Sequence, residues 1–217
     1  MIVYMVEGGK YYSLEDSLKR DENTPRGVYI NLTNRCDNDC VFCLRQTKQM
    51  ARESSLWLER EPTVEEVEKE LRAAPWHVIK EVVFCGFGEP TLRLNELIEL
   101  LGWLKKNYPS VPTRLNTNGL GELAHGRVIA PEFEGLLDVA SISLNASTAE
   151  KYFALTRSSY GLGSFEAMLT FAEHMRDHVP TVVLTIVDKV SPPDEIERCR
   201  QLCSARNLTL RVRPFEK

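Results

Sequence analysis

Three cysteines, Cys36, Cys40 and Cys43, lie within eight residues at C-x3-C-x2-C spacing. They follow directly after an apolar segment, residues 28–32, whose composition is that of a strand. Cysteine thiolates are the usual ligands of iron–sulfur clusters. Three of them on one short loop can hold three irons of a [4Fe–4S] cube. The spacing therefore predicts a cluster whose fourth iron is free of protein ligands.

A second motif follows one strand further along the chain. The strand predicted at Glu81–Cys85 runs into the stretch Gly-Phe-Gly-Glu-Pro, residues 86–90. Glycine allows another group to approach the backbone closely. Together the two motifs resemble those of the radical S-adenosylmethionine (SAM) superfamily, in particular the small TatD-associated radical SAM proteins. Here one aromatic residue is inserted into the Gly-Gly-Glu-Pro pattern that is common in the superfamily.

The resemblance implies a function. In radical SAM enzymes the open iron binds SAM, and one electron from the cluster cleaves SAM to methionine and a 5′-deoxyadenosyl radical that abstracts hydrogen from a substrate. The implied cofactors are a [4Fe–4S] cluster and SAM. The implied partners are a reductant such as flavodoxin or ferredoxin and an unidentified substrate, for which a protein or peptide is one candidate. A glycyl-radical-activating or 7-deazapurine-forming enzyme is a more specific alternative.

The resemblance also implies which residues contact SAM. Glu89 would meet the SAM ammonium group, and no catalytic residue is expected beyond the cluster ligands. For Asn116 and Asn118, at the end of one predicted strand, the alternative to SAM binding is an Asn-Gly turn. For Ser143 and Asn145, at the end of the next predicted strand, the alternative is a helix cap with buried hydroxyls. The full set is Phe42, Gly86, Gly88, Glu89, Asn116, Asn118, Ser143 and Asn145.

A non-enzymatic iron–sulfur or zinc-binding module is the competing interpretation of the cysteines. A structural zinc site normally has four protein ligands, and the nearest histidine is His77. The chain has six cysteines, but disulfide frameworks are typical of small secreted chains without a core. Cys199 and Cys203, four residues apart on one helical face, are expected in the core. The role of Cys85 stays open.

The composition describes a chain that can bury one core. It has 217 residues, 43% of them hydrophobic, and a formal net charge of −4. That charge does not indicate nucleic acid as a partner. No apolar run approaches the roughly 20 residues that span a bilayer, so we expect no membrane segment and a cytoplasmic location. We expect an N-terminal hairpin and linker over residues 1–26 and a radical SAM core domain over residues 27–217.

Predicted strands and helices alternate along that core domain. The pattern indicates an α/β fold with a parallel sheet, flat or curled. The resemblance implies a partial (β/α)6 TIM-like barrel of parallel strands with a short N-terminal β-hairpin. Capping boxes are predicted at Thr63 with Glu66 and at Ser147 with Glu150. The predicted strands are Val28–Leu32, Glu81–Cys85, Thr113–Asn116, Val139–Asn145, Thr181–Val187 and Leu208–Arg213, and the longest helices are Leu94–Tyr108, Ser164–His178 and Asp194–Arg206.

Alternation within the strands predicts where a ligand would lie. Ser141, Ser143 and Asn145 share one face of their strand, and the residues between them are apolar. A face that becomes polar toward the carboxyl end suits the mouth of a barrel, where α/β folds bind ligands. Arg211 and Arg213 share a face of the last strand: they either line the barrel and bind an anionic substrate or SAM, or lie on an exposed edge. Arg157 is either a partner of the SAM carboxylate or a solvated cation at a helix end.

Overall fold

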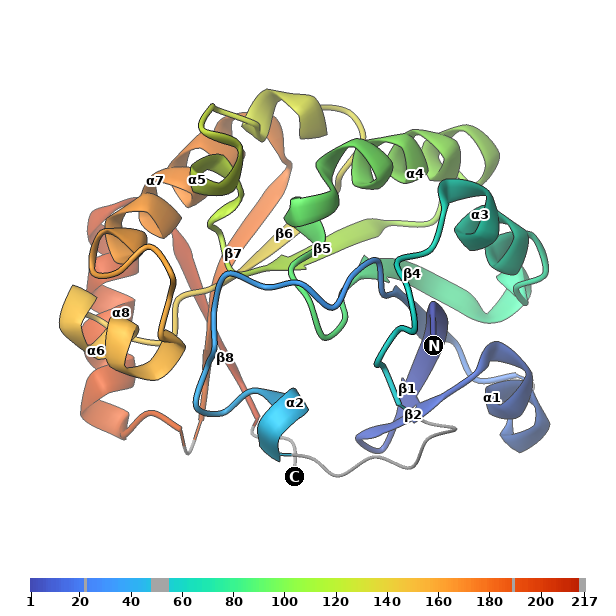
Figure 1. The fold of residues 1–217 in the computed structure, drawn as a ribbon, viewed down its shortest axis with the longest axis horizontal. Helices are drawn as coiled ribbons and strands as arrows, with labels where there is room; N and C mark the ends of the chain where they lie inside the picture. The colour runs from blue at the N-terminus through green and yellow to red at the C-terminus, as the bar shows by residue number, and fades with distance from the viewer. Residues whose placement is uncertain (22, 48–54, 189, 215–217) are drawn as a thin grey trace.

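The computed structural model describes residues 1–21, 23–47, 55–188 and 190–214. Within these residues eight strands form one sheet in the order β2-β1-β3-β4-β5-β6-β7-β8 (Figure 1). Because the strands β3 to β8 are adjacent in the sheet in the order of the sequence, each connection between them is a simple crossover. The strands are β1 Val3–Glu7, β2 Lys10–Tyr12, β3 Arg26–Ile30, β4 Ile79–Phe84, β5 Thr113–Thr117, β6 Val139–Ser143, β7 Thr181–Val187 and β8 Thr209–Arg213.

The six strands β3 to β8 are parallel, and the N-terminal hairpin extends the sheet at one end. Strand β1 pairs antiparallel with both β2 and β3, with Tyr4 opposite Tyr29. The order of strands ends at β2 and β8, so among the described residues the sheet does not close into a ring. This arrangement confirms the predicted α/β fold, a partial barrel of parallel strands with a short hairpin.

Helices connect the parallel strands and cover the outer face of the sheet, as Figure 1 shows. Their ends follow the sequence signals closely, since α4 stops before Pro109 and α7 before Pro180. The segment predicted as a linker after the hairpin contains a short helix, α1. The helices are α1 Leu14–Arg20, α2 Leu44–Thr47, α3 Val64–Arg72, α4 Leu94–Asn107, α5 Gly121–His125, α6 Ala149–Thr156, α7 Gly163–His178 and α8 Pro193–Ala205.

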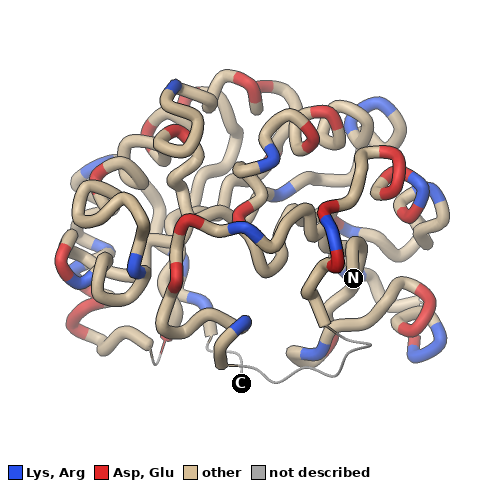
Figure 2. The backbone as a smooth tube through the Cα atoms, in the orientation of Figure 1, with Lys and Arg blue, Asp and Glu red and all other residues tan. Residues whose placement is uncertain are grey.

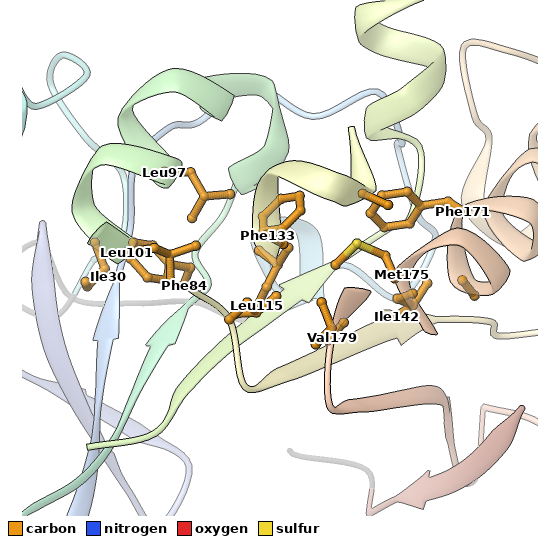
Figure 3. Packing of buried hydrophobic residues seen from close by; sticks show 14 of the residues in the cluster. Ile30, Phe84, Leu97, Leu101, Leu115, Phe133, Ile142, Phe171, Met175 and Val179 are labelled. Atoms are coloured by element: carbon orange, nitrogen blue, oxygen red, sulfur yellow. The ribbon is translucent and has the colours of Figure 1, made fainter. Parts of the chain in front are cut away.

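The hydrophobic core lies between the outer face of the sheet and these helices. Leu97, Leu101 and Leu104 on α4 are spaced three and four residues apart, and all are buried. They belong to one cluster with Phe84 of β4 and Leu115 of β5, and Figure 3 shows Leu97 and Leu101 above these strands. The predicted apolar strand faces are therefore the ones that pack under helices, which leaves the other face free to form a site.

One predicted helix start is confirmed and one is wrong. Thr63 and Glu66 form the predicted capping box at the start of α3. At α6 the cap is Thr148 in place of Ser147, and its side chain accepts from the Lys151 backbone. Ser147 instead donates its backbone N–H and its hydroxyl to Glu195 on α8, both at 2.7 Å. The tertiary contact to a buried carboxylate thus decides where the helix begins.

The charged residues lie mainly outside this core. Figure 2 shows acidic and basic positions interspersed along the outer helices. Among the described residues, no helix combines the length and the apolar character that crossing a membrane requires.

Replacing a core leucine tests the packing of α4 on the sheet. Leu101 is fully buried, so we expect Leu101→Ala to lower the free energy of unfolding by about 2–5 kcal/mol through lost burial and a residual cavity. Leu123→Ala, at a position 40% exposed on α5, is the control and is expected to cost far less. Chemical denaturation measures both. Equal losses in the two variants would contradict this packing.

Candidate functional site

The cysteine loop connects β3 to α2 and lies against the end of α6. The last carbonyl groups of a helix have no partner within it. Here the backbone N–H of Asp39 donates to the Thr156 carbonyl and that of Val41 to the Leu155 carbonyl, both at 2.9 Å. In return, the Ser159 N–H donates to the backbone carbonyl of Asp37 at 2.9 Å. Backbone hydrogen bonds therefore fix the loop that carries the three thiols.

The Gly-Phe-Gly-Glu-Pro loop after β4 packs on the other side of the cysteine loop. The Glu89 N–H donates to the Arg35 carbonyl at 2.7 Å. A Cβ added at Gly88 would lie 2.3 Å from the Thr33 carbonyl oxygen and 2.5 Å from that of Arg35. One added at Gly86 would lie 2.0 Å from the Asn31 side chain. Both glycines are therefore required for two loops, far apart in the sequence, to touch.

Glu89 is a buried carboxylate that ties this loop to the end of β5. Its Oε1 accepts from the Thr91 N–H and hydroxyl and from the Thr117 hydroxyl, at 2.7–3.1 Å. Its Oε2 accepts from the Asn118 N–H at 2.7 Å. Burial raises the pKa of Glu89, while these four hydrogen bonds act in the opposite direction. Three of these bonds fall on Oε1 and one on Oε2, so Oε2 is the oxygen with room for a further donor.

The three thiols lie within electrostatic reach of one another. Burial, together with the nearby Glu89 and Cys43, raises the pKa of Cys36 to about 11. Burial, together with the nearby Cys36 and Cys43, raises the pKa of Cys40 to about 12. Asn118 directs its Nδ2 toward the Cys36 sulfur at 3.9 Å. Arg45 on α2 is the cation that favours the thiolate forms of Cys36 and Cys40.

A cavity of about 520 Å³ opens beside these thiols on the inner side of the sheet. From the cysteine loop it is lined by Cys40, Phe42 and Cys43, and from the loop after β4 by Gly86 and Phe87. A larger hollow of about 920 Å³ lies around Trp57 and Arg60, and no cysteine lines it. The smaller cavity is the one that brings both sequence motifs to a single space.

The donor set of this loop fits an iron–sulfur cube. A single metal ion needs its ligands to converge on one point, and no group of three Cys, His, Asp or Glu side chains in the described part of the chain does so. A cube takes one thiolate on each iron, so its ligands surround a space. Cys40 and Cys43 line the cavity and Cys36 acts electrostatically on Cys40, and iron charge would offset the burial that raises the pKa of Cys36 and Cys40. Binding of the cluster by these three cysteines stays a prediction.

The remaining residues predicted to bind SAM lie at the same end of the sheet, and their contacts with SAM stay predictions. Asn116 lines the cavity. Asn118 forms the alternative Asn-Gly turn as well, because its Oδ1 accepts from the Leu120 N–H and Gly119 has a φ of +78°. Ser143 and Asn145 close β6, where Asn145 adopts a left-handed φ of +61°. Neither is among the described residues that line the cavity.

Both arginines of the last strand line the cavity, and so does one arginine that the sequence interpretation missed. Arg211 and Arg213 face it from β8, although they are on an edge strand. Arg114 on β5 faces it as well. The signal for Arg114 was its place two residues before Asn116, on the same strand face. Arg157, by contrast, is 58% exposed and lies 3.7 Å from Asp39, as a solvated helix end would.

The three other cysteines divide between the cavity and the core. Cys85 lines the cavity, and burial raises the pKa of its thiol. Cys199 and Cys203 on α8 are buried in the main hydrophobic cluster, which confirms their predicted place in the core.

A family model described as the radical SAM superfamily matches residues 30–203. The chain belongs to the radical SAM superfamily. Its cofactors are accordingly a [4Fe–4S] cluster and SAM. The match confirms the resemblance to the superfamily inferred from the cysteine motif and the glycine-rich loop, while the particular likeness to the TatD-associated proteins stays a prediction.

Several curated relatives are GTP 3',8-cyclases. The GTP 3',8-cyclase of Corynebacterium glutamicum is 35% identical over 138 residues, which cover 61% of this chain and 34% of that protein. The probable GTP 3',8-cyclase of Thermococcus kodakarensis is 29% identical over 157 residues, covering 72% of this chain and 46% of that protein. The chain thus spans between a third and a half of the length of these relatives.

Solved structures share the fold at lower sequence identity. Streptococcus suis SuiB bound to its precursor peptide SuiA superposes with a TM-score of 0.66 at 18% identity, over 93% of this chain and 42% of that chain. TYW1 with a lysine-pyruvate adduct superposes with a TM-score of 0.62 at 14% identity, over 99% of this chain and 78% of that chain. At these identities the likeness shows the fold alone.

Substituting Gly88 tests the contact between the two loops. The Cβ of Gly88→Ala would meet two backbone carbonyl oxygens, which cannot rotate away. We therefore expect the loops to separate, the free energy of unfolding to fall and the iron content after anaerobic reconstitution to drop. Iron analysis and visible absorption measure the cluster.

The matched control is Gly102→Ala in α4, where nothing lies within 4 Å of an added Cβ. It is expected to stabilise the protein by about 0.5–1 kcal/mol, because alanine favours a helix, and to leave the iron content unchanged. Full cluster loading in Gly88→Ala would contradict the proposed contact.

Proposed function

We propose that this chain holds a [4Fe–4S] cluster on Cys36, Cys40 and Cys43 and cleaves SAM reductively to act on an unidentified substrate. The cofactors, when bound, supply a one-electron cleavage that yields methionine and a 5′-deoxyadenosyl radical, which abstracts hydrogen from the substrate. The observation that carries this proposal is the 520 Å³ cavity that the cysteine loop and the glycine-rich loop line together. A purely structural cluster needs no such space beside it.

Phe42 lines that cavity and Glu89 and Asn118 lie near Cys36, and the three have separable roles in the proposal. Glu89 would accept a hydrogen bond from the SAM ammonium group, because its Oε2 accepts one hydrogen bond from the protein. The carboxylate also lies close enough to Cys36 to raise the pKa of that thiol. Asn118 would donate to the sulfur of Cys36 and so favour the reduced state of a cluster there. Phe42, between two of the ligands, would exclude water.

The proposal requires an electron donor and a substrate. A flavodoxin or ferredoxin would supply the electron, and both are typical of the cytoplasm. The substrate enters the cavity from the open side of the barrel. A peptide or protein is one candidate, because the sheet does not close between β2 and β8. A glycyl radical enzyme would be one such protein substrate.

A second candidate is chemistry on a purine nucleotide. It is favoured by the names of the relatives, several of which are GTP 3',8-cyclases at 27–35% identity. A 7-deazapurine precursor belongs to the same chemical class. Incubating the reduced enzyme with SAM and GTP and analysing the purine products tests this candidate.

Removing one thiol tests the central step. We expect Cys40→Ala to lose the visible absorption of the cluster and to form no deoxyadenosine or methionine above the protein-free background after reduction with SAM. Chromatography of the anaerobic reaction measures both products. Cys203→Ala, which removes a thiol of the core, should form both at the wild-type rate. Cleavage of SAM by Cys40→Ala would contradict the proposal. If the wild-type protein binds the cluster and does not cleave SAM, a non-enzymatic iron–sulfur module is favoured.

Replacing the carboxylate tests its contact with SAM. Glu89→Gln puts an amide N–H₂ where the carboxylate accepts hydrogen bonds. We expect a loss of about 1–3 kcal/mol in unfolding free energy from unsatisfied buried groups, and weaker SAM binding as well. Calorimetric titration of the holoenzyme with SAM measures the second effect. Glu99→Gln, on the exposed face of α4, controls for the lost charge. Lower stability with unchanged SAM affinity would contradict the assigned role.

A further inference from the structure

Three arginines converge on the inner face of the sheet in the same cavity as the thiols. Arg114 comes from β5, and Arg211 and Arg213 from β8. Strand β7 lies between β6 and β8, and the Nη2 of Arg211 is 3.4 Å from the Ser141 hydroxyl on β6. The Arg211 side chain therefore lies across the inner face, toward β5. An arginine placed on an edge strand for solubility would extend away from the sheet instead.

The positive charge of this cluster is only partly balanced by the protein. Glu81 supplies one carboxylate to these arginines, with its Oε1 3.1 Å from the Arg114 Nη2. Partial desolvation and the neighbouring guanidinium groups of Arg114 and Arg213 lower the pKa of Arg211. Like charges that repel at short range cost free energy, and a bound anion would offset that cost.

Two buried polar atoms in the cavity lack partners in the described structure. They are the Nε of Arg114, a donor, and the Oδ1 of Asn116, an acceptor. Leaving a buried polar group unsatisfied costs about 1–3 kcal/mol. Both residues line the cavity, so this unpaired donor and this unpaired acceptor lie in its wall. A ligand that contacts both side chains would carry an oxyanion for the guanidinium group and a hydroxyl or amine for the amide group.

We propose that Arg114, Arg211 and Arg213 bind an oxyanion of the substrate, a carboxylate or a phosphate. Guanidinium groups pair with both anions in two-pronged geometry. Cys85 lines the same cavity, where Arg213 and Arg114 offset part of the rise in thiol pKa that burial causes. This inference rests on the proposed function, since it names the substrate class of the same cavity.

Calorimetric titration of the anaerobic holoenzyme tests the proposal with two probes, inorganic pyrophosphate and the tricarboxylate tricarballylate. We expect the wild type to bind at least one of them. The double variant Arg211→Gln/Arg213→Gln should bind the same probe at least about tenfold more weakly. The loss of a single charge-assisted hydrogen bond is enough for a change of that size. Tighter binding of pyrophosphate would identify a phosphate-bearing substrate, and tighter binding of tricarballylate a carboxylic acid.

Arg200→Gln is the control, because Arg200 is on the outer face of α8 and pairs with Glu197. It should keep the wild-type affinity, and a loss equal to that of the double variant would overturn the proposal by showing nonspecific screening. Absence of binding by the wild type would also overturn it. The proposal would also be overturned if the double variant lost as much affinity for SAM as for the anion, because the arginines would then bind SAM.

The single variant Arg211→Gln, at an exposed position, repeats the test if the double variant melts below the wild type. Cleavage of SAM by the wild type without substrate is measured in parallel. Failure of that cleavage with intact anion binding would count against the proposed function and leave the anion site standing.

Discussion

The close approach of two backbone loops is the constraint on which the rest of the site depends. The loop after β4 touches the cysteine loop through the Glu89 N–H and the Arg35 carbonyl, at 2.7 Å, and only a glycine fits at position 88. On its other side the cysteine loop caps the carbonyl end of α6. Three thiols on one loop need such a frame, because without it their positions would vary and no cube could form. The fold supplies it from segments more than 50 residues apart.

The two faces of the sheet divide stability from chemistry. The outer face packs Phe84, Leu115 and Ile142 under helices and contains the main hydrophobic cluster. The inner face carries polar and charged side chains around a cavity, including Arg114 and Asn116 with unsatisfied atoms. Groups of this kind destabilise a protein unless a ligand meets them. The unpaired groups on this face are therefore best explained by what it binds.

Sequence patterns predicted the strands, the parallel sheet and the location of the site, because alternation and motif spacing are local properties. Thr181–Val187 was predicted with its observed bounds, and most other boundaries moved by one or two residues. What failed depended on contacts between distant segments. Ser147 matches a helix cap locally, but the buried carboxylate of Glu195 binds it instead. The sequence left two alternatives for Arg211, an exposed sheet edge or the lining of the barrel. The three-dimensional arrangement of the strands decides between them, because Arg211 lines the same cavity as Arg114 of β5.

The open iron is tested most directly by electron–nuclear double resonance on the reduced holoenzyme. SAM labelled with ¹⁵N at its amino group should give a ¹⁵N coupling to the cluster, because three cysteines leave one iron for this ligand. A spectrum with no coupling from the label, and with a protein nitrogen or a fourth thiolate on that iron, would contradict the central claim.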